Sequence, residues 1–239
     1  MGYFQEKNKV RLNKWIASQG ICSRREADRL IEAGKVTVNG EAVTSLGTKI
    51  NPYKDKVGYT FDPESFRSAK TTVVLNKPDG FVVTASEEEG ANIYSLTAGL
   101  PDDCRPVGRL DKDSSGIIIL TNDTSLPAKI IGEGTHCEKE YFVKTTLTIS
   151  DPALDKLRHG VKILDDTTLP ARIRRESADS FYITLVEGKN RQIRRMCRKV
   201  GASVETLIRV RIGNVRIGNL QSGQWRQLTP EELSYFDGL

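Results

Sequence analysis

The dipeptide Asn39-Gly40 separates two short runs of strand-forming residues, Val36-Thr37-Val38 and Glu41-Ala42-Val43. A two-residue hairpin loop needs positive φ at its central positions, which Asn and Gly supply at least cost, so this arrangement predicts a tight β-hairpin. Two helical patterns precede the hairpin. The first forty residues therefore predict a helix–helix–hairpin unit.

Both predicted helices carry their own boundary signals. The first has a one-sided apolar stripe, and Gly20 is placed to end it. The second begins with a capping box, Ser23-Arg24-Arg25-Glu26, and ends at Gly34. The apolar positions are Leu12, Trp15 and Ile16 in the first helix and Ala27, Leu30 and Ile31 in the second, which leaves Arg24, Arg25 and Arg29 directed outward.

Positive charge is concentrated in two segments of the chain. Residues 1–40 hold eight Lys/Arg against four Asp/Glu, residues 187–211 hold eight against two, and the remainder has a net charge of −5. Two basic patches on an otherwise acidic protein are typical of a phosphate-backbone binder, because each neutralised phosphate releases counterions. On charge alone, the alternative that these are only solvated helix faces stays open.

Other features argue against several classes of protein. No run approaches the roughly 18 apolar residues of a membrane span, and the start of the chain lacks the apolar core of a signal peptide. The cysteines form no CxxC pair, and two histidines are too few for a multi-histidine metal site. We therefore expect a cytoplasmic protein with reduced thiols. The cysteines are Cys22, Cys104, Cys137 and Cys197, and the histidines are His136 and His159.

The chain divides near residue 66, within the irregular segment 51–70, into domains 1–66 and 67–239. In the second domain, runs of strands separated by isolated helices predict an α+β fold with a mixed, mainly antiparallel sheet and flanking helices. Strands are expected at Thr71–Asn76, Phe81–Ser86, Gly116–Leu120, Tyr141–Ile149, Thr168–Arg175 and Phe181–Val186. Helices are expected from Asp151, as its cap, to Gly160, from Asn190 to Gly201, and after Thr229.

The segment Gly108–Gly116 runs directly into the apolar strand Ile117–Leu120. A carboxylate in such a glycine-bounded loop is held rigidly while it still faces solvent or substrate, which suits Asp111 to catalysis. Most loop aspartates only cap turns, and the pattern alone does not decide between the two roles.

Three segments of the first forty residues closely resemble the S4 RNA-binding domain: Val10–Ile16, Gly20–Asp28 and Gly34–Gly40. The resemblance implies that the helices and the hairpin form one compact unit, which holds structured RNA with its basic helix face. It shifts the interpretation of the basic residues from solvated surface to phosphate contact.

The loop segment 108–116 closely resembles the catalytic motif of the RsuA/RluB/RluF family of pseudouridine synthases, in which the Asp after Arg-Leu is the nucleophile. Three further stretches agree with the family in order: Leu75–Gly80, Glu138–Tyr141 and Glu187–Met196. The resemblance spans nearly the full chain. Lys112-Asp113-Ser114 and His136 most resemble the RluF type, which acts on 23S rRNA.

The reaction implied by the resemblance explains the residue types. Isomerising uridine to pseudouridine breaks the N1 glycosidic bond, turns the base and rejoins it through C5, so no cofactor or metal is expected. Asp111 would either attack the anomeric carbon or remove a proton from C2′ to give a glycal, and both routes stay open. The target base must first leave its stack, at a cost of a few kcal/mol.

The resemblance also implies partners for Asp111. Arg194 is the family position whose guanidinium pairs with the nucleophile and holds it charged and oriented. Tyr141 packs against the target base and assists the proton lost from C5, with core packing as the alternative role of a strand tyrosine. Lys77 and Pro78 are interpreted as scaffold below the loop.

The same resemblance, with the two basic patches, gives a set of expected RNA contacts. Arg191 and Arg195 are expected to face phosphate or solvent, and Arg109 to reach RNA or support the catalytic loop. The full set is Arg11, Asn13, Lys14, Arg24, Arg25, Arg29, Lys35, Arg109, Lys189, Arg191 and Arg195.

The prediction is a monomeric RNA pseudouridine synthase that acts on ribosomal RNA, with 23S rRNA as the first choice. An enzyme for 16S rRNA or tRNA is the alternative within the class. A non-catalytic S4-type ribosome-assembly factor is the alternative from another class. Asp111, Tyr141 and Arg194 argue against it, because a protein that only binds RNA does not need all three.

Overall fold

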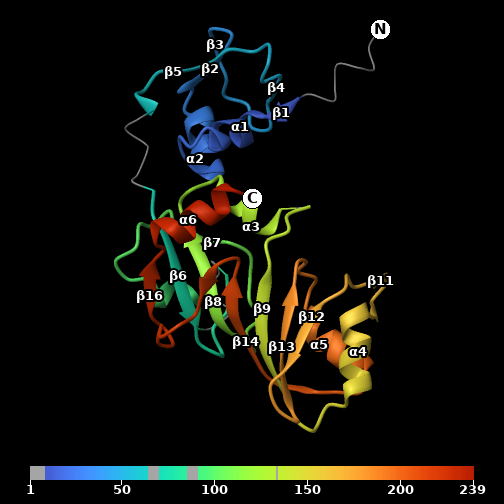
Figure 1. Cartoon of the computed structure of the whole chain (residues 1–239). Helices are drawn as coiled ribbons and strands as arrows, with labels where there is room; N and C mark the ends of the chain where they lie inside the picture. Colours follow the sequence, from blue (N-terminus) through green and yellow to red (C-terminus); the bar gives the residue numbers. More distant parts are fainter. Residues whose placement is uncertain (1–8, 64–69, 85–90, 133) are drawn as a thin grey trace, which may run out of the picture. The chain divides into compact units, whose positions relative to one another are not determined.

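Asn39-Gly40 closes the predicted hairpin in the computed structural model, which describes residues 9–63, 70–84, 91–132 and 134–239 (Figure 1). Asn39 has φ 56° and Gly40 has φ 92°, the positive values that a tight hairpin turn requires. The strands β2 (Val36–Val38) and β3 (Glu41–Ala42) join β5 (Val57–Tyr59) in a three-stranded sheet. The hairpin prediction is confirmed.

Two short helices, α1 (Leu12–Ser18) and α2 (Arg24–Glu32), pack beside this sheet. Their apolar faces form one buried cluster with Val36 of β2 and Ile50 of β4 (Lys49–Ile50), the strand that pairs with β1 (Val10–Arg11). Ser23 caps α2 by accepting a hydrogen bond from the Glu26 amide at 3.2 Å. The Glu26 carboxylate accepts from Arg29 at 3.0 Å, so only the Ser23 half of the expected capping box is observed.

The chain forms two compact units, residues 1–70 with 122–125, and residues 71–121 with 126–239. The boundary predicted near residue 66 falls within residues 64–69, and the start of the chain within residues 1–8, both outside the described residues. No described helix is long and apolar enough to cross a membrane.

A mixed sheet of nine strands forms the centre of the second unit, counted over its described residues. The strand order is β12-β13-β9-β14-β8-β6-β16, with β15 beside β14 and β7 beside β8. Every neighbouring pair is antiparallel except β14 with β8. The strands are β6 (Thr72–Lys77), β7 (Arg105–Pro106), β8 (Ser115–Thr121), β9 (Lys139–Thr145), β12 (Arg172–Arg175), β13 (Ser180–Leu185), β14 (Val204–Ile212), β15 (Val215–Arg216) and β16 (Trp225–Gln227), with a separate hairpin of β10 (Lys162–Ile163) and β11 (Asp166–Thr167).

Helices cover the sheet at both ends. At the end formed by β9, β12 and β13, α4 (Asp151–His159) and α5 (Gln192–Lys199) lie side by side over one apolar cluster (Figure 1). At the other end, α3 (Leu126–Ile131) and α6 (Pro230–Asp237) pack on one face of β6 and β8, and the 3-10 helix η4 (Ile93–Leu96) packs on the opposite face. The predicted α+β class with a mixed, mainly antiparallel sheet is therefore confirmed.

The strand predicted at Phe81–Ser86 is wrong over its described part. Only an isolated bridge joins Val82 to Asn92, and residues 85 and 86 lie outside the described ranges. The Phe81 carbonyl accepts a hydrogen bond from the buried Lys77 ammonium at 2.7 Å. Val82 pairs with the segment 91–93: its amide donates to the Ala91 carbonyl at 2.9 Å, and its carbonyl accepts from the Ile93 amide at 3.1 Å.

Two other strands are shorter than predicted. β9 ends at Thr145, whose hydroxyl donates to the Leu147 carbonyl at 2.7 Å and closes a turn, so the alternation from Tyr141 to Ile149 does not continue as a strand. The strand expected from Thr168 begins at Arg172, because the Thr168 hydroxyl accepts from the Val161 amide at 3.1 Å. In both cases a threonine side chain takes a backbone group out of the sheet pattern.

The helix boundaries shift by one or two residues. Ser150, rather than Asp151, caps α4, and its hydroxyl accepts from the Ala153 amide at 3.3 Å. α5 begins at Gln192 instead of Asn190, because Arg191 adopts a left-handed conformation and ends the preceding loop. The longest strand, β14, was not predicted, since its polar and charged residues fall within the basic segment 187–211.

Gly116 is the point where β8 and β14 meet. The two strands pair only at Ile208 with Ser115 and Arg209 with Gly116. A Cβ added at Gly116 would lie 2.3 Å from the Arg209 carbonyl oxygen and 2.5 Å from its amide nitrogen. The close approach of the two central strands therefore requires glycine at this position.

Lys77, predicted as scaffold, is fully buried at the end of β6. Its ammonium donates to the carbonyls of Pro78 at 2.8 Å and Phe81 at 2.7 Å, and reaches the Lys112 carbonyl at 3.5 Å. Burial lowers the pKa of Lys77 to about 8, although Asp79, Asp113 and Asp111 act in the opposite direction. One buried cation thus ties the turn after β6 to the loop before β8.

We predict that Gly116→Ala destabilises the second unit by more than about 3 kcal/mol, because it combines a backbone clash with an unfavourable φ of 103°. Gly201→Ala is the matched control, since its φ is 80° and no atom lies within 4 Å of the added Cβ. It should cost about 1 kcal/mol. Native-state hydrogen exchange of the β8 amides measures both. Equal effects would contradict the close-packing argument.

A second prediction concerns the stability of the chain above pH 8. Below pH 8 the folded and unfolded states both carry the Lys77 proton, and folding bears the full desolvation cost. Between pH 8 and 10.5 the folded state loses this proton first, so the free energy of unfolding should rise, by up to about 3 kcal/mol. Urea unfolding of wild type and Lys77→Met at pH 7.5, 9 and 10.5 tests this. A rise of the same size in Lys77→Met would assign it to other groups.

Candidate active site

Asp111 lies in the segment between β7 and β8, at a hollow of about 650 Å³ in the second unit. Its carbonyl accepts a hydrogen bond from the Ser114 amide at 3.1 Å, which closes a turn around Lys112 and Asp113. Leu110 is buried in the apolar cluster below, whereas the Asp111 side chain is 32% exposed. The loop is anchored by its apolar residue and presents its carboxylate to the hollow.

The loop is also fixed from the opposite side. The Lys112 carbonyl accepts from the Gly80 amide at 2.9 Å and lies 3.5 Å from the Lys77 ammonium. Gly80 has φ 83°, which allows the chain to turn back toward the loop. These contacts hold the backbone next to Asp111 without using its side chain.

Tyr141 is one of the residues that line the hollow. It lies at the middle of β9, opposite Ile183 of β13 and Arg209 of β14. Its half-buried ring packs against both apolar clusters that meet below the loop, the one under α5 and the one that includes Leu110. An aromatic face beside a carboxylate suits a flat ligand that stacks on one group and reacts at the other.

The arginines are arranged differently from the expectation. Arg194 contacts Asp113: its Nε lies 3.3 Å from the Asp113 Oδ2, and its Nη2 donates to the Asp113 carbonyl. Asp111 is instead paired with Arg191, whose Nη1 lies 3.8 Å from the Asp111 Oδ2. The Arg194–Asp111 pair is not present among the described ion pairs, because the loop turn directs Asp113 toward α5.

Arg191 is therefore part of the loop network and does not simply face solvent. Both of its terminal nitrogens donate to the Asp113 carboxylate, at 2.9 and 2.7 Å. This bidentate hydrogen bond holds the pKa of Asp113 below its usual range and raises that of Arg191. The site is thus a cluster of two carboxylates and two guanidiniums.

Of the other basic residues expected near the loop, Arg109 and Lys189 line the hollow and Arg195 does not. Arg109 is exposed and lines the hollow. Lys189 pairs with Asp166 and lies 3.5 Å from Glu187, and the hydrogen bond to Asp166 raises the pKa of Lys189. Arg195 donates to the Asn190 side chain at 3.0 Å.

The first unit exposes most of the residues expected to contact RNA. The exposed ones are Arg11, Lys14, Arg24, Arg25, Arg29 and Lys35. Asn13 differs: it is 8% exposed, and its side-chain amide donates to Asp28 at 3.0 Å. The buried amide links α1 to α2, so the structure gives Asn13 a scaffold role instead of the expected RNA contact.

Three residues that line the hollow were not predicted. Lys139 and Arg209 are buried cations, and each donates to a backbone carbonyl at 2.7 Å, of Ile130 and Ile117 respectively. Gln192 is buried and connects the Lys189 amide to the Glu187 carboxylate. A charged residue in an alternating strand is expected to face solvent, so the sequence carries no signal for Arg209. Lys139 and Gln192 lie in the stretches Glu138–Tyr141 and Glu187–Met196 that resemble the family, and this resemblance is the signal that could have found them.

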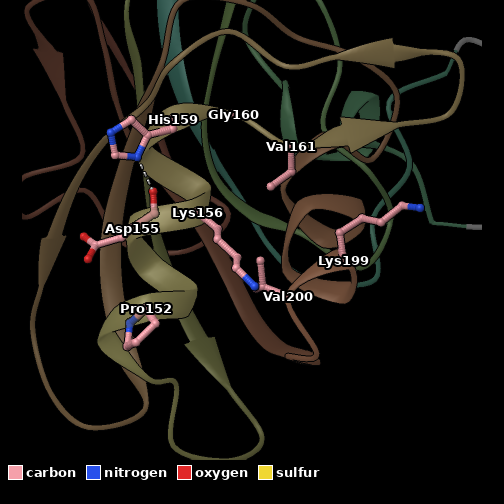
Figure 2. A pocket seen from close by; sticks show the side chains of 8 residues that line it. All are labelled: Pro152, Asp155, Lys156, His159, Gly160, Val161, Lys199 and Val200. Atoms are coloured by element: carbon pink, nitrogen blue, oxygen red, sulfur yellow. Dashed lines mark hydrogen bonds between the residues drawn. The ribbon is translucent and has the colours of Figure 1, made fainter.

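A second hollow, of about 470 Å³, lies at α4 and the end of α5 (Figure 2). The His159 Nδ1 is 2.8 Å from the Asp155 carbonyl, and the Asp155 carboxylate binds Arg158. In Figure 2 that carboxylate points away from Lys156 and Lys199. The hollow at Asp111 is the candidate active site, because it brings a loop carboxylate together with an aromatic ring and guanidinium groups.

The described residues contain no group of three or more His, Cys, Asp or Glu placed to hold a metal ion. Burial raises the pKa of the Cys197 thiol to about 12 and also raises that of Cys137. These two thiols are apolar core residues, as predicted. The side chains that line the hollow include a carboxylate, guanidinium groups and an aromatic ring.

Comparison with protein families agrees with this arrangement. Residues 71–199 match the RNA pseudouridylate synthase family, and residues 10–52 match the S4 domain. The chain is 43% identical over 227 residues to the dual-specificity RNA pseudouridine synthase RluF of Escherichia coli strain K12, which covers 94% of this chain and 77% of that protein. It is 34% identical to the ribosomal large subunit pseudouridine synthase B of Bacillus subtilis, over 93% of each chain.

A solved structure is similar over almost the whole chain. A crystal structure of a pseudouridylate synthase aligns with a TM-score of 0.70 and 28% identity, and the match covers 95% of this chain and 99% of that one. The fold, the sequence and the S4 domain thus give the same assignment. The chain belongs to the RNA pseudouridine synthase family.

Proposed function

We propose that this enzyme isomerises a uridine of 23S rRNA to pseudouridine, with Asp111 as the nucleophile. The observation that carries the proposal is the placement of Asp111: its carboxylate faces a hollow beside the Tyr141 ring, on a loop fixed by buried contacts. The relative named ribosomal large subunit pseudouridine synthase B supports the choice of a large-subunit RNA.

The reaction balances without an external reagent. The N1–C1′ bond of uridine breaks, the C5–C1′ bond forms, N1 gains a proton and C5 loses one. Asp111 acts at the sugar, either by attack on C1′ or by removal of the C2′ proton. Tyr141 offers its face to the base and its hydroxyl to the proton transfer at C5.

Access to the hollow requires the target base to leave its stack. Extrusion costs a few kcal/mol, which binding energy elsewhere on the RNA must supply. The exposed basic residues of the S4 domain and the Arg109 side chain at the rim are suited to this task, because phosphate contacts do not depend on sequence. The S4 domain then supplies affinity and the second unit supplies the chemistry.

The alternative target is 16S rRNA of the small ribosomal subunit, and one of the relatives supports it. The chain is 32% identical over 94% of its length to the ribosomal small subunit pseudouridine synthase A of Escherichia coli. The 34% identity to the ribosomal large subunit pseudouridine synthase B supports 23S rRNA as the first choice. The non-catalytic assembly factor loses support, because the match to the synthase family model runs through the loop that carries Asp111.

We predict that Asp111→Asn abolishes isomerisation and leaves RNA affinity within a few-fold of wild type. The amide keeps the shape of the side chain but removes the charge and the nucleophilic oxygen. Single-turnover assays on in vitro transcribed 23S rRNA, read by carbodiimide-primer extension, measure the rate, and filter binding measures the affinity. Asp155→Asn, on the surface of α4, is the control. Turnover of Asp111→Asn near the wild-type rate would refute the assignment.

The S4 domain is tested separately by the double variant Arg24→Gln/Arg25→Gln, which removes two exposed charges from α2. If both contact phosphate, the slope of log affinity against log salt should flatten by about 1.4 to 1.8. The rate at saturating RNA should stay unchanged, because such contacts help ground and transition states equally. Arg158→Gln in the second unit serves as the control. An unchanged slope would exclude phosphate contacts by this pair.

A further inference from the structure

Asp113 is the residue that most of the charged contacts at the catalytic loop share. Its two carboxylate oxygens accept from the two terminal nitrogens of Arg191, at 2.9 and 2.7 Å. The Nε of Arg194 lies 3.3 Å from the same carboxylate, and the Nη2 of Arg194 donates to the Asp113 carbonyl. One residue, two positions after Asp111, therefore binds both arginines at this end of α5.

Arg194 extends this network away from the loop. Its Nη1 donates to the Val204 carbonyl at the start of β14, at 3.2 Å. Its side chain is 15% exposed, against 47% for Asp113. Arg194 thus connects the loop, α5 and β14, and its position depends on an acceptor at Asp113.

Arg191 is held in a backbone conformation that few side chains adopt. Its φ of 49° and ψ of 35° are left-handed, a conformation that is unfavourable for a residue other than glycine. Its ion pair with Asp113 is partly exposed, and such pairs contribute little to stability. The arrangement therefore fixes a geometry more than it stabilises the fold.

Asp111 has a guanidinium close to its carboxylate, but this guanidinium does not form a hydrogen bond with it. The Arg191 Nη1 is 3.8 Å from the Asp111 Oδ2, which is too long for a hydrogen bond but close enough for charge attraction. If Arg191 made its bidentate pair with Asp111 instead, both nucleophile oxygens would be occupied. Asp113 takes up the guanidinium and so prevents this.

We propose that Asp113 is a positioning residue for the reaction: it holds Arg191 and Arg194 beside Asp111 while it keeps the oxygens of Asp111 available to the sugar. The inference rests on the proposed role of Asp111 as nucleophile. Asp113 touches neither base nor sugar in this scheme and acts through the two guanidiniums.

The first test is Asp113→Asn, in single-turnover assays on in vitro transcribed 23S rRNA. The rate at saturating enzyme should fall by about 10- to 100-fold, the scale of an ångström-sized misplacement, with RNA affinity within about threefold of wild type. Asp113→Glu, which restores the bidentate acceptor, should recover most of the rate. Asp155→Asn, which removes another exposed arginine-binding carboxylate, should retain the wild-type rate. A wild-type rate for Asp113→Asn, or a loss seen only in affinity, would overturn the proposal.

A double-mutant cycle with Arg191→Gln tests whether Asp113 acts through the arginine. If it does, Asp113→Asn/Arg191→Gln should be no slower than the slower single variant, because both changes remove one interaction. Rate losses that multiply in the double variant would contradict this route.

An NMR measurement on the RNA-free protein keeps this test separate from the substrate assignment. In wild type, the bidentate pair should restrict rotation of the Arg191 guanidinium and give resolved Nη resonances. Asp113→Asn should merge these resonances, and Asp155→Asn should leave them resolved.

Averaged Arg191 resonances in wild type would overturn the proposal whatever RNA the enzyme uses. If Arg191 is restricted but wild type does not modify 23S rRNA, the substrate assignment fails and the pair stands. If wild type is active, Asp111→Asn is inactive and Asp113→Asn is unaffected, only the positioning role fails.

Discussion

The close contact of β8 with β14 at Gly116 is the constraint on which the site depends. Because Gly116 has no side chain, the Arg209 backbone approaches to a distance that any other residue would block. The two strands pair over only two residues, both at the start of β8, directly after the loop that carries Asp111. The loop thus leaves the sheet at the point where its two halves join, and the hollow that holds Asp111 is lined from both halves.

The cations around this loop bind two kinds of acceptor, backbone carbonyls and the Asp113 carboxylate. Lys77, Lys139 and Arg209 are buried and donate to backbone carbonyls, so they fix the chain below and beside the hollow. Arg191 and Arg194 belong to α5 and its N-cap, and they bind the loop carboxylate at Asp113. Positive charge therefore surrounds Asp111 without covering it, which suits the proposed role of this carboxylate as the nucleophile.

The sequence predicted local features well where each residue acts on its own chain neighbours. The Asn39-Gly40 turn and the buried face of α2 follow from short-range patterns, and both are observed. It predicted poorly where a partner distant in sequence decides the outcome. The backbone of Val82 pairs with Ala91 and Ile93, so an isolated bridge replaces the expected strand over its described part. The strand β14 lies within a basic segment, although its Arg209 is buried.

The site shows the same division. Asp111 and Tyr141 were predicted from motif and resemblance, and the structure brings both to one hollow, although their roles remain proposals. The partner of each arginine could not be predicted, because the turn from Asp111 to Ser114 decides which carboxylate faces α5. Because of that turn, Arg194 contacts Asp113, and Arg191 is the arginine that lies beside Asp111.

The central claim, a uridine isomerase for 23S rRNA, is tested most directly by mapping pseudouridines across total RNA from cells with and without this gene. Carbodiimide-primer extension would cover 23S rRNA, 16S rRNA and tRNA in one comparison. The account predicts that at least one 23S rRNA pseudouridine disappears with the gene and returns when the wild-type gene is restored. Loss confined to 16S rRNA or tRNA would contradict the substrate, and an unchanged map would contradict the proposed activity in the cell.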